Sequence, residues 1–257
     1  HSTVTLPHGV TLTCRSSGDR GRPVLLFLHG FPEAAFVWDE LLAHFSQPEH
    51  GGYRCVAPNL RGYAGSSAPS DVRDYRAKHL VQDVLALIAQ ETGGAPLAAL
   101  VAHDWGGAVA WNLAALPPQA TERLAIINSP HPGTFLRELQ QSPTQQAASA
   151  YMNFLCRPDA AALLAEDDFR RLWPFFTNMG AADGPHAWLT DAVKDQYRAV
   201  WRQGLDGPLN YYRASPLRPA TATDPGAQAV MLPREMLDIH VPTHVLWALN
   251  DTALPPG

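Results

Sequence analysis

The sequence has few lysines, no dense basic run and no long apolar run. Its 257 residues include 19 Lys and Arg against 24 Asp and Glu, and Lys78 and Lys194 are the only lysines. The formal net charge of -5 does not suit a phosphate backbone, so no nucleic-acid partner is expected. No apolar stretch reaches the roughly 18 residues that a membrane-spanning helix needs, so no membrane partner is expected either.

Cysteine is scarce as well. Cys14, Cys55 and Cys156 are odd in number and far apart, without the spacing of a metal site or of a disulfide framework. The chain starts at His1 and shows no charged-then-apolar signal pattern at its N-terminus. These features predict a cytoplasmic protein, a monomer or homodimer, with reduced cysteines and with neither a metal nor another cofactor.

With 46% hydrophobic residues, the chain can bury one large core. Strand-like and helical segments alternate in its first half. Strands are predicted within a hairpin over 2–16 and at 24–30, 53–58, 97–102, 124–129 and, later, 243–249; helices are predicted at 35–46, 74–91 and 106–116. Alternation at this spacing predicts βαβ units and therefore an α/β fold with a mostly parallel sheet.

The pattern changes between residues 130 and 233. This stretch contains amphipathic segments with Trp and Tyr and no clear buried strand. Helices are predicted at 134–141, 144–155, 158–166, 188–203 and 206–213, separated by Pro or Gly. The sequence therefore predicts an α/β core of residues 1–129 and 234–257 that is interrupted by a helical insertion, 130–233.

A tight turn is predicted where the strand at 97–102 meets the next helix. The segment 102-AHDWG-106 has the order small, any, nucleophile, any, small, which is typical of a nucleophile elbow. The small outer residues let strand and helix approach, and the helix N-terminus stabilises an ionised Asp104. A plain alternative is that Asp104 caps the helix and His103 is a packed histidine. The segment 29-HGFPE-33 follows an earlier strand, where backbone N–H groups could provide half of an oxyanion hole.

Four segments together resemble a known family. They are 29-HGFPEAAFVW-38, 59-NLRGYAGSS-67, 102-AHDWGG-107 and 128-NSPHP-132. The chain resembles the epoxide hydrolase branch of the α/β-hydrolase superfamily over most of residues 2–255. The resemblance implies an α/β-hydrolase fold with a helical cap and an Asp nucleophile, Asp104, that hydrolyses an apolar epoxide to a vicinal diol. It also implies an oxyanion hole formed by the backbone N–H groups of Phe31 and Trp105.

Opening an epoxide requires an acid opposite the nucleophile, because the ring oxygen becomes an alkoxide. The resemblance places this role on two cap tyrosines, Tyr212 of 207-GPLNYYR-213 and Tyr151 of 149-SAYMNF-154, with Tyr211 as an alternative register. Taken singly, either tyrosine is more typical of a packed aromatic residue. The predicted pocket walls are aromatic: Trp38, Trp105, Phe154, Phe175 and Phe176.

The catalytic triad is only partly readable. The segment 245-VLWALNDTAL-254 resembles the family's strand-seven turn, which puts Asp251 in the position of the orienting carboxylate. A simple turn Asp after Asn250 is the alternative. No His follows His244, and the earlier histidines fit structural roles better: His29, His103, His131, His186, His240 and His244. We therefore expect part of a longer enzyme, without its general base and its last strand and helix.

Other functions remain open at this stage. Haloalkane dehalogenases share the Asp nucleophile followed by Trp, but many have Asn at the position of Phe31, and a halide site does not need a tyrosine pair. Fluoroacetate dehalogenases have Arg where this chain has Trp105, and a serine esterase is disfavoured by Asp104. A relative that binds an apolar ligand without catalysis also remains possible, because a fold does not determine a function.

Overall fold

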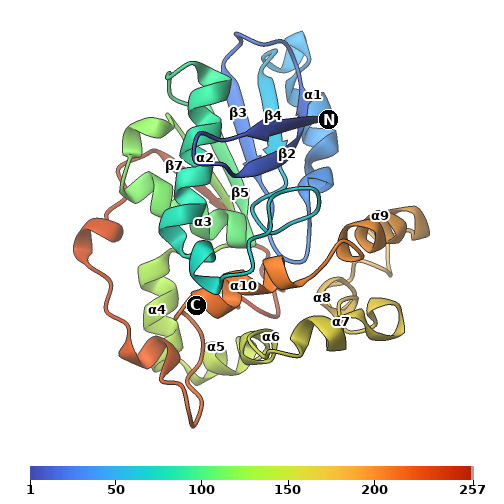
Figure 1. Ribbon diagram of the computed structural model, residues 1–257, viewed down its shortest axis with the longest axis vertical. Coiled ribbons are helices and arrows are strands. Elements are labelled where there is room, and N and C mark those ends of the chain that lie inside the picture. The colour runs from blue at the N-terminus through green and yellow to red at the C-terminus, as the bar shows by residue number, and fades with distance from the viewer. Residues whose placement is uncertain (256–257) are drawn as a thin grey trace.

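The structure, a computed structural model, describes residues 1–255. It consists of a seven-stranded sheet flanked by helices and of further helices gathered at one end of the sheet (Figure 1). The strand order is β1-β2-β4-β3-β5-β6-β7, antiparallel from β1 to β4 and parallel from β4 onward. The strands are β1 (Ser2–Thr5), β2 (Thr11–Ser17), β3 (Val24–Leu28), β4 (Arg54–Pro58), β5 (Ala99–His103), β6 (Leu124–Ile127) and β7 (Thr243–Leu246). The predicted α/β architecture with a mostly parallel sheet is confirmed.

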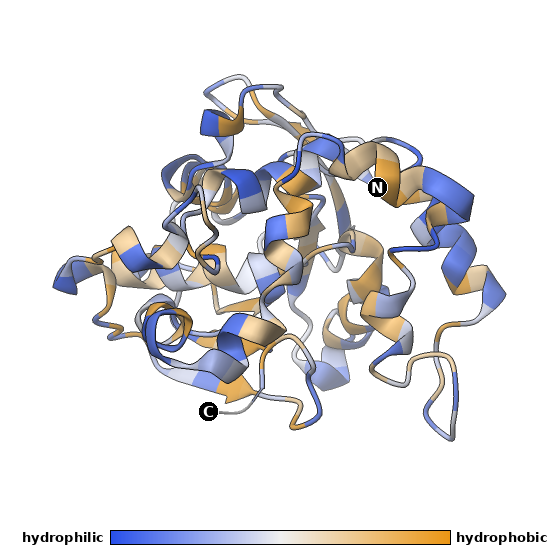
Figure 2. Cartoon of the chain, turned by 90° about the horizontal axis from the view of Figure 1, so that it is seen from below, coloured by the Kyte–Doolittle hydropathy of each residue, from blue (hydrophilic) through white to orange (hydrophobic). Residues whose placement is uncertain are grey.

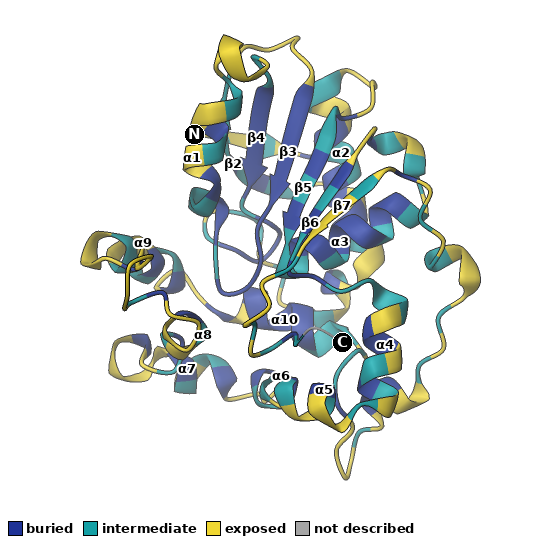
Figure 3. Ribbon diagram, turned by 180° about the vertical axis from the view of Figure 1, so that it is seen from behind, coloured by how far each residue is buried: buried dark blue, intermediate teal, exposed yellow. Residues whose placement is uncertain are grey.

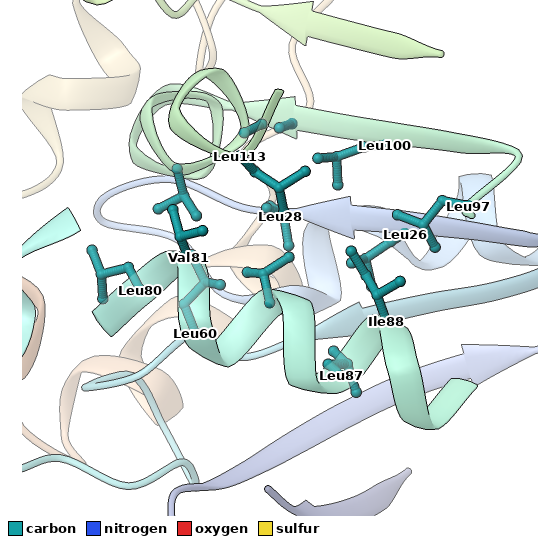
Figure 4. Close-up of a cluster of buried hydrophobic side chains, with 14 of the residues drawn as sticks. Leu26, Leu28, Leu60, Leu80, Val81, Leu87, Ile88, Leu97, Leu100 and Leu113 are labelled. Atoms are coloured by element: carbon teal, nitrogen blue, oxygen red, sulfur yellow. The ribbon is translucent and has the colours of Figure 1, made fainter. Parts of the chain in front are cut away.

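Helices cover both faces of the sheet. They are η1 (Ala35–Trp38), α1 (Asp39–Phe45), η2 (Pro48–His50), η3 (Val72–Tyr75), α2 (Ala77–Thr92), α3 (Asp104–Ala115) and η4 (Pro118–Ala120). Every residue of β3 is buried. Leu26 and Leu28 point to the core under α2 and α3 (Figure 4), and Leu25 and Phe27 belong to the core on the α1 side. This explains why the central strands are continuous apolar runs in the sequence.

The remaining helices lie beyond the carboxyl ends of the parallel strands. They are α4 (Pro132–Gln141), α5 (Pro143–Ala148), α6 (Tyr151–Leu155), α7 (Ala160–Phe169), α8 (Pro174–Thr177), α9 (Asp191–Trp201), α10 (Asp206–Ala214), η5 (Gly226–Ala229) and η6 (Arg234–Met236). We call the segment from α4 to α10 the cap helices. Hydrophilic and hydrophobic segments alternate along them (Figure 2), and their apolar residues form a core of their own. The single helix predicted at 144–155 is wrong in detail, since it divides into α5 and α6.

A buried ionic network fixes α10 against the sheet side of the molecule. Arg61 donates two hydrogen bonds of 2.7 Å to the carboxylate of Asp83 in α2, and His8 Nε2 lies 2.7 Å from the same carboxylate. The hydroxyl of Tyr211 in α10 donates to the backbone oxygen of Arg61 at 2.8 Å. Removing one partner of such a pair leaves a buried charge without its counter-ion, so this network strongly constrains the position of α10.

β7 is one edge of the described sheet. Its outer residues Val245 and Leu246 are 53% and 50% exposed, in contrast to the buried central strands (Figure 3). An edge of this kind presents unpaired backbone groups to which another strand can bind. None of the described helices is both long and apolar enough to cross a membrane.

The close approach of α3 to β3 gives a first prediction. A Cβ added at Gly106 would lie 2.6 Å from the backbone oxygens of Leu28 and His29, and backbone cannot yield as a flexible side chain does. Gly106→Ala should therefore lower the free energy of unfolding by about 2 kcal/mol or more, measured by urea denaturation. Gly133→Ala in α4 is the matched control, because its added Cβ meets side chains alone: the end of Leu237 at 3.0 Å and the ring of His131 at 3.4 Å. Equal stability of the two variants would contradict the prediction.

Candidate active site

The turn between β5 and α3 places Asp104 at the carboxyl edge of the sheet. Asp104 has a φ of +50°, a conformation that costs energy for a residue with a side chain and that the surrounding packing must impose. Ala102 is completely buried, Gly106 touches the backbone of β3, and a side chain at Gly30 would overlap Asp104 itself. The small residues of the predicted elbow therefore have a direct steric cause.

Backbone donors surround the carboxylate of Asp104. The N–H of Phe31 donates to its Oδ1 at 2.7 Å, and the N–H of Trp105 also hydrogen-bonds to this side chain. Ser129 supports the turn, because its Oγ donates to the backbone oxygen of Asp104 at 2.7 Å. Withdrawal from water raises the pKa of Asp104 above its usual value, although the charge of His103 and the two N–H groups act in the opposite direction. The two donors predicted for an oxyanion hole thus both reach this carboxylate.

An ion pair lies directly beside the elbow. His103 Nδ1 is 2.8 Å from Glu33 Oε2, and the hydroxyl of Tyr197 in α9 donates to the other oxygen of Glu33 at 3.5 Å. Burial acts to lower the pKa of His103, but Glu33 and Asp104 outweigh it and raise that pKa to about 9. In the same way, His103 outweighs burial and lowers the pKa of Glu33. At neutral pH a positive charge therefore stands next to Asp104.

Two tyrosines of the cap helices stand above Asp104. Tyr151 begins α6 and Tyr212 lies in α10; their ring centroids are 6.3 Å apart, and Tyr212 is 5.1 Å from the ring of Trp105. Burial, with the negative charge of Asp104, raises the pKa of both hydroxyls, so both carry their protons at neutral pH. The register alternative, Tyr211, is already bound to the backbone of Arg61. Geometry therefore favours Tyr212 over Tyr211 beside Asp104.

Asp251 lies on the loop after β7. Its Oδ1 accepts hydrogen bonds from the backbone N–H groups of Ala253 and Leu254 at 2.8 and 2.9 Å, and its Oδ2 accepts from Asn128 Nδ2 at 2.7 Å. Asn128 follows β6 with a φ of +41°, and its own Oδ1 binds the N–H of Ala248. Asn128 therefore connects the ends of β6 and β7. Sequence reasoning gave it no role, although it begins the quoted segment 128–132.

Within residues 1–255, no histidine hydrogen-bonds to Asp251. His103 in the elbow and His29 beside the loop of Phe31 already have partners. His103 is protonated by its pairing with Glu33. His29 uses both ring nitrogens, one with the oxygen of Gly30 at 2.9 Å and one accepting from the N–H of Leu60 at 3.1 Å. Neither fits the role of a base, as the sequence predicts.

A cavity of about 600 Å³ opens beside these groups. Asp104, Trp105, Tyr151 and Tyr212 line it together with residues from the start of α2, one face of α3, α4 and the chain after α10. This volume lies within the range of small-molecule sites, and its walls are mainly apolar. The elbow, both tyrosines and Trp105 thus share one cavity.

Of the five predicted wall residues, Trp105 lines the cavity and the other four lie elsewhere. Trp38 is buried on the α1 side of the sheet, with its ring centroid 5.5 Å from that of Phe27, so its assignment as a substrate contact is wrong. Phe154 does not line the cavity either; it packs on the core of the cap helices, with Arg157 over its ring at 5.9 Å. Phe175 packs against Phe31 and therefore stands behind the site. Phe176, the last predicted wall residue, packs against Tyr197 and Trp201 of α9.

Comparisons with known proteins agree with this arrangement. A family model described as "alpha/beta hydrolase fold" matches residues 23–257. The chain is 32% identical to the AB hydrolase superfamily protein YfhM of Bacillus subtilis (strain 168), covering 96% of this chain and 80% of that protein. It is also 32% identical to human Epoxide hydrolase 4, covering 92% of this chain but only 61% of that relative's length.

Solved structures of epoxide hydrolases are similar too. A Bacillus megaterium epoxide hydrolase in complex with an inhibitor superposes with a TM-score of 0.86 at 30% identity, over 99% of this chain and 85% of the other. An epoxide hydrolase from metagenomes of hot environments gives a TM-score of 0.83 at 37% identity, over 99% and 84%. Both similarities include the sheet, the elbow and the cap helices, because they extend over nearly the whole chain.

The Glu33–His103 pair predicts a pH dependence of stability. The pKa of His103 is raised from 6.5 to about 9 in the folded protein, so the folded state binds more protons than the unfolded state between these values. The stability from this pair is fully present below pH 6.5 and is lost as the pH rises through about 9. Urea denaturation at pH 6, 7.5 and 9 should therefore show a falling free energy of unfolding. His103→Gln should flatten this slope, and an unchanged slope in that variant would refute the assignment.

Proposed function

Because the chain belongs to the α/β-hydrolase fold family, on its epoxide hydrolase branch, we propose that it hydrolyses an apolar epoxide to a vicinal diol through an ester on Asp104. One observation carries the proposal. A carboxylate held by two backbone N–H groups faces, across the same cavity, two tyrosine hydroxyls that keep their protons. A nucleophile and an acid on opposite sides of a small molecule are what ring opening requires.

In the first step, an oxygen of Asp104 attacks one carbon of the epoxide. A carbon–oxygen ester bond forms, the carbon–oxygen bond of the ring breaks, and its electron pair goes to the ring oxygen. Tyr151 or Tyr212 donates a proton to that oxygen, and the pair shares the charge that develops there. The raised pKa of these hydroxyls makes their hydrogen bonds to the ring oxygen most favourable when it becomes an alkoxide.

In the second step, water attacks the carbonyl carbon of the ester and gives up a proton. The tetrahedral intermediate then collapses, the bond between the carbonyl carbon and the substrate oxygen breaks, and that oxygen takes a proton, so the diol leaves and the carboxylate of Asp104 is restored. The negative charge on the carbonyl oxygen falls where the N–H groups of Phe31 and Trp105 point, which supports their role as the oxyanion hole. Asp251, fixed by Asn128, is suited to orient a base for that water. Within residues 1–255, however, no histidine contacts Asp251, so this step is the slower of the two for the chain as printed.

The first step can be tested by intact mass spectrometry. Incubation with an aryl or alkyl epoxide should add the mass of one epoxide per chain, located on the peptide with Asp104, while less than one equivalent of diol is released. Asp104→Asn should form no adduct. Steady diol release by the printed chain would contradict the expected order of rates, and an adduct at another residue would contradict the proposal itself.

The acids can be tested in the same assay. Tyr151→Phe together with Tyr212→Phe should slow adduct formation by about 100-fold or more, because proton donation in the transition state is lost. Tyr75→Phe is the matched control, because Tyr75 also lines the cavity but its hydroxyl donates to the backbone oxygen of Pro69. An unchanged rate in the double variant would exclude the tyrosine pair as acids. Release of halide from a matched haloalkane, without an adduct from the corresponding epoxide, would instead favour a dehalogenase that uses the same Asp104.

A further inference from the structure

The cavity has a direction, which is set by one face of α3. Asp104, Ala108 and Asn112 all line it, and residues four apart lie above one another on a helix. With a rise of 1.5 Å per residue, Asn112 lies roughly 12 Å from Asp104 along the axis of α3. Ala115, one turn further on the same face, is not part of the cavity wall. The cavity therefore runs along about two turns of α3 and ends near Asn112.

Aromatic side chains pack around Phe31, whose backbone N–H binds Asp104. The ring of Phe31 packs edge-on against Tyr212 at 5.2 Å and against Phe175 at 5.7 Å, and Phe175 packs against Tyr151 at 5.6 Å. Phe31 is 6% exposed, and neither Phe31 nor Phe175 lines the cavity. Space for a bound molecule thus extends to one side of the reacting carboxylate.

The walls along α3 are mainly apolar. Their apolar members include Leu80 of α2, Val109 of α3, Phe135 of α4 and, from the chain after α10, Leu217, Leu232 and Met236. Arg76, Arg213 and Arg218 also line the cavity. At the far end, the Nδ2 of Asn112 is tied to the backbone oxygen of Ala108 at 2.8 Å, so its polar carboxamide stays where the apolar walls stop. We call the part of the cavity that runs from Asp104 past Ala108 to Asn112 the lane. An unbranched hydrocarbon chain fits a space of this length and polarity.

Resting on the proposed function, we propose that the substrates are terminal, monosubstituted epoxides with an unbranched apolar tail of roughly eight carbons lying along α3. Ala108 leaves room for the tail because it has only a methyl group, and Asn112 marks the end of the lane. Epoxides with a long substituent on each ring carbon are excluded, because the second substituent meets Phe31 and Phe175.

A homologous series of 1,2-epoxides tests this proposal while holding the reacting group constant. The second-order rate constant for adduct formation on Asp104 is measured for 1,2-epoxybutane, 1,2-epoxyhexane, 1,2-epoxyoctane, 1,2-epoxydecane and 1,2-epoxydodecane. Each added CH2 that is buried should raise it by about two- to fourfold, and the gain should stop near 1,2-epoxydecane. The isomer trans-5,6-epoxydecane, which has the same mass, should react at least about tenfold more slowly than 1,2-epoxydecane. The reason is that its two short arms bury fewer CH2 groups along α3.

Two variants locate the lane. Ala108→Leu fills the lane one turn from Asp104, so the rate constant should stop rising at 1,2-epoxyhexane. If this variant does not fold, Ala108→Val takes its place. Ala115→Leu adds the same bulk beyond Asn112 and should leave the series unchanged. Rate constants independent of tail length, or an Ala108→Leu series like that of the unmodified chain, would overturn this inference alone. The absence of an adduct with every epoxide would instead overturn the proposed function, and the inference with it.

Discussion

The carboxylate of Asp104 stands at a strained turn and largely out of bulk water, and the structure around it serves to keep it there. A charge in this position is costly unless hydrogen bonds and an opposite charge compensate it. Two backbone N–H groups supply the hydrogen bonds, and the protonated His103 supplies the charge. The small residues on either side are required because this turn brings α3 within contact of the backbone of β3.

The same charge connects the sheet to the cap helices. His103 keeps its proton because Glu33 is beside it, and Glu33 also receives a hydrogen bond from Tyr197 of α9. One residue earlier, the backbone oxygen of Pro32 accepts a hydrogen bond of 2.7 Å from the indole of Trp201. The loop that supplies the N–H of Phe31 is therefore held from both sides. A displacement of α9 would therefore change the charge near Asp104 through Glu33 and His103, although α9 itself makes no contact with Asp104 in this chain of interactions.

The sequence was sufficient for features that depend on local patterns. The apolar run of β3, the small residues around Asp104 and the alternation of strands and helices each follow from contacts between neighbouring residues or from full burial. Trp38 was misplaced because the sequence does not say which face of the sheet a short helical turn such as η1 packs on. The pairing of Glu33 with His103 joins residues 70 positions apart, and no spacing in the sequence indicates that separation. Asn128 was missed for a similar reason, since its partner Asp251 is 123 positions away.

The two steps of the proposed reaction depend on different parts of the fold. Ring opening needs only the elbow, the N–H groups of Phe31 and Trp105, and the two tyrosines, all of which are fixed by packing between the sheet and the cap helices. Ester hydrolysis depends on the loop after β7, which is held through Asn128 at the edge of the described sheet. The proposed capture site therefore stands at the ends of β3 and β5 in the middle of the sheet, whereas Asp251, the proposed orienting carboxylate, follows the exposed strand β7. A perturbation of that edge should affect release of the ester before it affects capture of the epoxide, because no contact of Asp104 passes through β7.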